Sequence, residues 1–199
     1  MKLLLPLLFT TTIFTTAYAQ RSLPDVDAEI PRSMLAINTP LIIRGKPVSV
    51  DFRGGIKQRV VDNPNDPINS VLLRVIGFKM TADLPSDAGG KRRTITIEQN
   101  DVDVDPKSFL RLTQRSPKYE QVDVLSFTMV FDEPEGSLVK REPLVLTTKD
   151  PMKLVGSLTQ FPPRGDLYQL QSPVELVEVD NPDVTVVTIE KFPVKTGGL

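Results

Sequence analysis

The stretch that most constrains the fold is Gln121–Phe131, with the sequence QVDVLSFTMVF. Successive side chains of an extended chain point to opposite faces. One face therefore carries Leu125, Phe127, Met129 and Phe131, and the other carries Val122, Val124, Ser126, Thr128 and Val130. Because both faces are apolar or small, we predict a central strand that is covered on both sides. Ser70–Thr81 has the same character and is predicted to be a second central strand.

Shorter alternating segments fill the rest of the chain and are separated by Pro, Gly, Asn and Asp. Arg92–Gln99 alternates isoleucine with threonine, and Gly54-Gly55 is predicted as a turn between strands at 47–52 and 56–62. No segment combines a helical period with caps. We predict an all-β fold, a single antiparallel β-sandwich of the immunoglobulin-like or jelly-roll type, over residues 34–192. A closed barrel is the alternative, because strand order cannot be deduced from one sequence.

The two ends of the chain are predicted to lie outside this domain. Residues 1–19 have one cation, Lys2, then an apolar run that ends in Ala17-Tyr18-Ala19, which is typical of a secretory signal peptide. A membrane anchor is disfavoured, because a spanning helix needs about 20 predominantly apolar residues. We expect a secreted or periplasmic protein with no integral membrane segment after cleavage. Residues 20–33 are predicted to be an N-terminal tail or edge segment, and 193–199 a C-terminal tail.

Three residue types are absent from the sequence: Cys, His and Trp. Their absence excludes disulfides, the usual zinc and copper sites, and Ser–His–Asp or Cys–His catalysis. The charges nearly balance, with 24 Lys and Arg against 25 Asp and Glu, so we expect no nucleic-acid partner, which would need a concentrated basic surface. Catalysis by paired carboxylates is the enzyme route that stays open.

The acidic stretch at residues 101–105 is a candidate calcium site. In a strand, Asp101, Asp103 and Asp105 share one face, and carboxylate oxygens suit Ca²⁺. The stretch lacks the glycine and distal glutamate of the EF-hand loop. A solvated strand face, with Val102 and Val104 turned to the core, is the favoured interpretation, so no cofactor is expected apart from this calcium candidate.

Two loops are further candidates. Residues 62–67, DNPNDP, offer several oxygens to a cation, although the same residues are good turn formers without a ligand. Arg164, Gly165 and Asp166 match the tripeptide by which integrins bind adhesion proteins, and Pro162-Pro163 would project it from the surface. A match of three residues arises easily by chance.

These observations favour an exported, non-catalytic β-sandwich module. We expect it to bind a protein partner, or to self-associate within an envelope or extracellular assembly, through an edge strand or a loop. The alternative is a carboxylate-based hydrolase that acts on an extracellular polymer. A pocket that holds two facing carboxylates would distinguish the hydrolase from the binding module.

Overall fold

The structure, a computed structural model, describes residues 23–84, 93–100, 102, 104–132 and 142–197. Within these ranges, thirteen antiparallel strands form one sheet and no helix is present. Accordingly, no helix in the described part of the chain is long and apolar enough to cross a membrane. The predicted all-β, antiparallel fold is confirmed. Its strands join in one sheet that closes in a ring. The predicted signal peptide, 1–19, lies outside the described residues.

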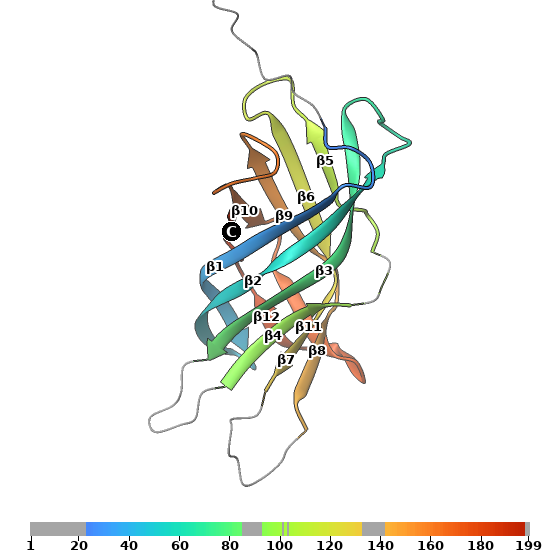
Figure 1. Ribbon diagram of the computed structural model, residues 1–199. Helices are drawn as coiled ribbons and strands as arrows, with labels where there is room; N and C mark the ends of the chain where they lie inside the picture. The colour runs from blue at the N-terminus through green and yellow to red at the C-terminus, as the bar shows by residue number, and fades with distance from the viewer. Residues whose placement is uncertain (1–22, 85–92, 101, 103, 133–141, 198–199) are drawn as a thin grey trace, which may run out of the picture.

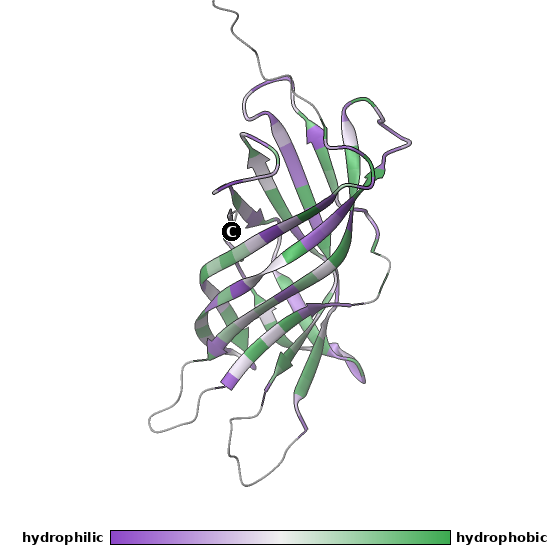
Figure 2. Ribbon diagram, viewed as in Figure 1, coloured by the Kyte–Doolittle hydropathy of each residue, from purple (hydrophilic) through white to green (hydrophobic). Residues whose placement is uncertain are grey.

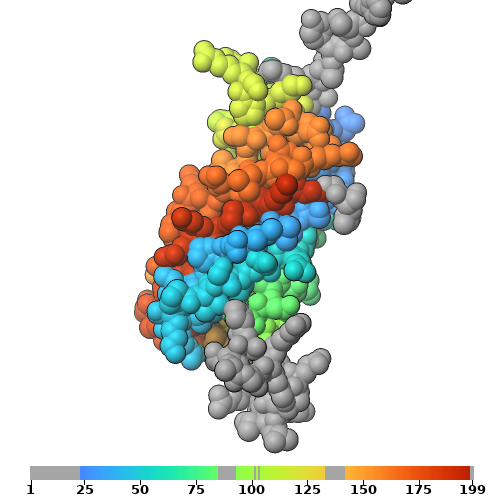
Figure 3. All heavy atoms as spheres, turned by 90° about the vertical axis from the view of Figure 1, so that its left-hand side faces the viewer, coloured from blue at the N-terminus to red at the C-terminus, as the bar shows by residue number. Residues whose placement is uncertain are grey.

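Three long strands run side by side across the whole molecule: β1 (Glu29–Ile43), β2 (Lys46–Asp62) and β3 (Ser70–Leu84) (Figure 1). The space-filling view shows β13, β1 and β2 adjacent on one face (Figure 3). The other strands follow one another end to end: β4 (Arg93–Gln99) and β5 (Phe109–Leu112), β6 (Tyr119–Leu125) and β7 (Phe127–Phe131), β8 (Leu144–Thr148) and β9 (Met152–Leu158), β10 (Leu167–Leu170) and β11 (Val174–Glu178), β12 (Asn181–Ile189) and β13 (Val194–Gly197).

This arrangement divides the closed sheet into two halves that share β1, β2 and β3. In one half β4, β7, β8, β11 and β12 complete the ring, and β12 pairs back onto β1. In the other half β5, β6, β9, β10 and β13 complete it, and β13 pairs with β1. We call these the β4 half and the β5 half.

Hydrophilic and hydrophobic residues alternate along several strands (Figure 2), and most of the buried side chains are apolar. Leu125, Phe127 and Met129 are all buried, whereas Val122, Thr128 and Val130 on the opposite face are only partly buried. The strand predicted over Gln121–Phe131 is thus covered fully on one face and partly on the other. Ser126 divides this stretch into β6 and β7. In the β4 half the aromatic rings of Phe78 and Phe127 lie 6.0 Å apart, a favourable tilted contact.

Both ends of the domain extend beyond the predicted limits. Strand β1 begins at Glu29 rather than Met34, and β13 (Val194–Gly197) forms from residues expected to be a tail. Ile30 and Arg32 alternate inward with Met34, but the neighbouring prolines obscured this period in the sequence. Among the described residues, 29–32 of β1 pair with β2 alone and so lie at an edge, whereas later parts of β1 also pair with β13 or β12.

Gly54-Gly55 does not form the predicted turn, because β2 continues through both residues. Gly54 lies opposite Met80 of β3, and a Cβ at this position would come within 2.0 Å of the Lys79 carbonyl oxygen. The glycine is therefore required by the close approach of two strands. In a sequence this requirement looks the same as a turn signal.

Candidate functional site

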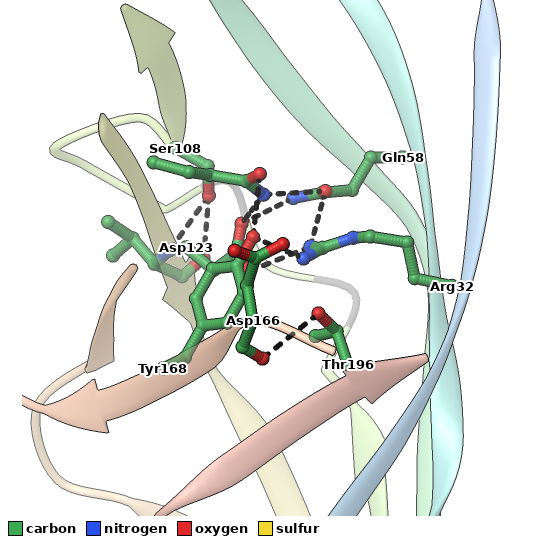
Figure 4. A network of polar contacts seen from close by, with 9 residues as sticks. Arg32, Gln58, Ser108, Asp123, Asp166, Tyr168 and Thr196 are labelled. Carbon is green, nitrogen blue, oxygen red and sulfur yellow. Dashed lines mark hydrogen bonds and ion pairs between the residues drawn. The ribbon is translucent and has the colours of Figure 1, made fainter. Parts of the chain in front are cut away.

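Polar side chains from opposite walls of the sheet meet inside the β5 half. They come from β1, β2, β6 and β10, and they are Arg32, Gln58, Gln121, Asp123 and Tyr168. We call them the polar cluster. Each strand places its member inward by ordinary alternation: Arg32 lies between Ile30 and Met34, and Gln58 lies between Ile56 and Val60. Figure 4 shows Arg32 and Gln58 pointing toward Asp123 and Tyr168.

The Arg32 guanidinium connects both walls. Its NH1 donates to the Tyr168 hydroxyl at 2.9 Å, and its NH2 donates to Gln58 Oε1 at 2.7 Å and to Asp123 Oδ2 at 2.8 Å. It also lies over the Tyr168 aromatic ring, 5.2 Å from the centroid. Among the described residues, Arg32 Nε has no hydrogen-bond partner.

The Asp123 carboxylate is fully buried and accepts hydrogen bonds at both oxygens. Besides Arg32, it accepts from Gln58 Nε2 at 2.8 Å and from Gln121 Nε2 at 2.6 Å. The Tyr168 hydroxyl donates to Gln121 Oε1 at 2.9 Å. Buried charges are tolerated when they are paired and hydrogen-bonded in this way. With its oxygens already engaged, Asp123 is poorly placed to act as a base or a metal ligand.

The pKa values of two members of the cluster, Tyr168 and Arg32, are shifted by their surroundings. Burial raises the pKa of Tyr168 well above its usual range, and the neighbouring Arg32 opposes this only in part. The phenol therefore stays neutral and able to donate. Burial tends to lower the pKa of Arg32, but Asp123 and Tyr168 more than offset it, so this pKa is raised and the guanidinium stays charged.

A second feature is an interruption of the sheet between β4 and β5, from Asn100 to Ser108. Strand β3 pairs with β5 over Ser70–Leu72 and with β4 over Lys79–Leu84. Within the described residues, no strand pairs with 73–78 on this side. Ser108 partly replaces the missing strand: its carbonyl accepts from the Leu73 backbone at 2.9 Å, and its Oγ accepts from the Val124 backbone at 2.8 Å.

A groove of about 970 Å³ lies at this interruption. We call it the β3 groove. Its lining is mixed, with nearly as much polar as apolar surface, and its apolar side chains include Val61, Leu72, Val75, Ile76, Val102 and Val104. Ile76 is 36% exposed and Val102 is 60% exposed. Strand β3 has a β-bulge here, because Lys57 and Gln58 of β2 pair with Gly77 and Val75 and leave Ile76 without a partner. Bulges commonly re-aim side chains beside functional sites.

The acidic calcium candidate is only partly described. Asp101 and Asp103 lie outside the described residues, and Asp105 is exposed. No group of three or more Asp or Glu that could hold a metal occurs in the part of the chain that the structure covers. In the loop 62–67, the Asp66 carboxylate accepts from Asn69, and the Asn63 side chain donates to Ser70 Oγ at 2.7 Å. These side chains therefore organise the turn itself.

The Arg164-Gly165-Asp166 candidate lies in the connection between β9 and β10. The Asp166 carboxylate accepts from the Arg164 backbone at 3.0 Å and from the Thr159 backbone at 3.4 Å. Gly165 has φ +79° and donates to the Thr196 carbonyl at 2.6 Å, which anchors the loop to β13. The carboxylate that an integrin would need is thus occupied in closing its own loop.

The polar cluster was not predicted from the sequence, although a signal for it exists. Gln121 and Asp123 are in phase with Leu125 and Phe127, which places two polar side chains on the buried face. A polar residue in phase with the core requires a buried partner. The partners are distant in sequence, however, and Arg32 and Tyr168 are 136 positions apart.

The fold and these two features define an all-β protein with a closed sheet, a polar cluster inside it and a groove of mixed lining in its wall. No protein-family model and no curated protein matches the sequence. A solved structure, that of DynF from the dynemicin biosynthesis pathway of Micromonospora chersina, is similar in fold. The TM-score is 0.62 at 18% sequence identity, and the match covers 96% of this chain and 93% of DynF. At this identity the likeness concerns the fold alone.

Proposed function

We propose that this chain is an exported, non-catalytic module that binds a protein partner through the β3 groove. The observation that carries the proposal is that three features lie together: the interruption between β4 and β5, the bulge at Ile76, and the β3 groove beside both, with exposed apolar side chains in its lining. Partly exposed Ile76 and Val102 offer apolar area that is not needed to fill the core. Apolar anchors seated in such grooves supply most of the binding energy of many protein complexes.

The charges of the described residues give no specific support to the hydrolase alternative. A second hollow is lined by two carboxylates, Glu29 and Glu98, but both are ion-paired with Lys or Arg. Among the described residues that line the β3 groove, Glu98 is the one acidic residue. Its carboxylate forms an ion pair with Lys79 Nζ at 3.3 Å. A glycosidase needs two carboxylates about 5 to 10 Å apart across a cleft. Asp123 lies inside the sheet and is held by three donors. The hydrolase therefore stays a prediction from the sequence.

A pair of isoleucines makes the test specific. Ile76 lies at the bulge of β3 and is 36% exposed, and Ile37 lies at a bulge of β1, outside the groove, and is 49% exposed. We expect Ile76→Lys to abolish capture of a partner by the mature protein from its native envelope or medium, and Ile37→Lys to retain it. The captured protein must then bind again in purified form. Equal capture by both variants would rule out the groove.

The exported location depends on the N-terminal pattern and is tested separately. When the full-length chain is expressed, we expect the protein recovered outside the cytoplasm to have lost residues 1–19 and to begin at Gln20. N-terminal sequencing of the exported protein measures this directly. Recovery of an uncleaved chain in the cytoplasm would contradict the proposed location and leave the groove test unaffected.

A further inference from the structure

Cations gather on the outer face of the sheet beside the β3 groove. Arg59 of β2 lies directly opposite Arg74 of β3 in the ladder, and Glu29 of β1 lies on the other side of Arg59. Glu29 binds Arg59 at 2.6 Å and also pairs with Lys57. Arg59 and Lys57 together lower the pKa of Glu29, so this carboxylate stays ionised and is already shared by two cations.

Arg74, unlike Arg59 and Lys57, forms no ion pair with Glu29. It is exposed, it lines the β3 groove, and within the described residues it makes no ion pair. Like charges directly opposite each other on neighbouring strands are destabilising. The whole chain has a net charge of −1, so the excess of cations beside Arg74 is local and does not reflect a basic composition. Within the described part of the chain no carboxylate pairs with Arg74, and an incoming anion would relieve the local excess of positive charge.

We propose that the partner segment recognised by the β3 groove is an extended peptide with an apolar and an acidic side chain two positions apart. This inference rests on the proposed function. Arg74 and Ile76 are themselves two positions apart on β3 and are both exposed. Side chains two apart on an extended peptide point the same way, about 6 to 7 Å from each other. The apolar side chain lies against Ile76, and the carboxylate binds the Arg74 guanidinium.

Two blocked peptides test the charge: acetyl-Thr-Val-Thr-Glu-Thr-amide and the same peptide with Gln in place of Glu. We expect saturable changes in the backbone NMR signals of Arg74, Ile76 and Gly77 of the mature protein. The Glu peptide should bind about two to five times more tightly, as expected for an exposed ion pair. This preference should disappear in high salt.

Matched variants locate the effect. Arg74→Gln should abolish the preference for the Glu peptide, and Arg53→Gln should retain it, because Arg53 is exposed on β2 but does not line the groove. Equal binding of both peptides by the wild type, no binding of either, or a preference that survives Arg74→Gln would overturn the inference. If both peptides bind equally and Ile76→Lys removes both, the groove remains a binding site and only its acidic specificity is wrong.

Discussion

Asp123 and Arg32 are charged side chains that the fold buries together, and each supplies the other's principal contact. Their ion pair is 2.8 Å long, and both side chains are almost completely shielded from water. Taking charges out of water is costly, and pairing with additional hydrogen bonds offsets much of that cost. The polar cluster is thus a structural device that fixes how β1, β2, β6 and β10 meet.

Removal of one charge from this pair should be strongly destabilising. We expect Asp123→Asn to lower the free energy of unfolding by about 3 to 5 kcal/mol, because Arg32 would keep its charge without a buried counter-ion. Urea unfolding of the mature protein measures this loss. The control is Asp83→Asn, an exposed position on β3, where we expect a change within about 0.5 kcal/mol. A loss below about 1 kcal/mol at Asp123 would show that the pair is not buried as described.

Tyr168 should make stability depend on alkaline pH. Its pKa is raised in the folded protein, chiefly by burial, whereas the unfolded chain titrates near pH 10. Above that pH the unfolded chain releases the proton and the folded protein keeps it, so the contribution of Tyr168 to stability is present below about pH 10 and declines as pH rises. We expect the free energy of unfolding to fall more steeply between about pH 9 and pH 11 in the wild type than in Tyr168→Phe. Parallel slopes would contradict this prediction.

At the scale of the element, the sequence predicts strands well and their joins poorly. Alternation correctly indicated Ser70–Thr81, Arg92–Gln99 and Gln121–Phe131 as strands. It could not show that the last of these divides at Ser126, because a serine on the outer face fits a continuous strand equally well. Nor could alternation show the β3 groove. This groove lies beside the part of β3 between its pairing with β5 and its pairing with β4. Such a gap depends on pairing between distant segments, which alternation does not encode.

Two glycines in these strands differ in how closely neighbouring atoms approach the position where a Cβ would lie. Gly156 of β9 lies opposite Tyr168 of β10, and a Cβ there would come within 2.7 Å of the Tyr168 aromatic ring. We expect Gly156→Ala to lower stability by about 1 to 3 kcal/mol, as overpacking in a closely packed core does. The control is Gly77→Ala, where the added Cβ would meet its nearest neighbour at 3.9 Å. Thermal unfolding compares the two, and equal melting temperatures would contradict the close approach.

For the whole molecule, the shared strands β1, β2 and β3 predict that both halves unfold together. Phe127 is buried in the β4 half, whereas Tyr119 and Tyr168 lie in the β5 half. Because the chain has no Trp, and Tyr18 would be removed with the signal peptide, tyrosine fluorescence of the mature protein reports on the β5 half alone. Circular dichroism reports on all strands, so the two signals can be compared in one unfolding experiment.

We expect Phe127→Ala to lower the urea midpoint of both signals by the same amount. Truncation of a buried Phe costs about 3 to 5 kcal/mol. Because β1, β2 and β3 belong to both halves, this loss should destabilise the β5 half as well. Coincident transitions are the mark of two-state unfolding. The matched control is Phe109→Ala on β5, a half-buried ring that should shift both midpoints by less. A fluorescence midpoint that stays in place while the dichroism midpoint falls would show that the halves unfold independently, and that the long strands do not couple them.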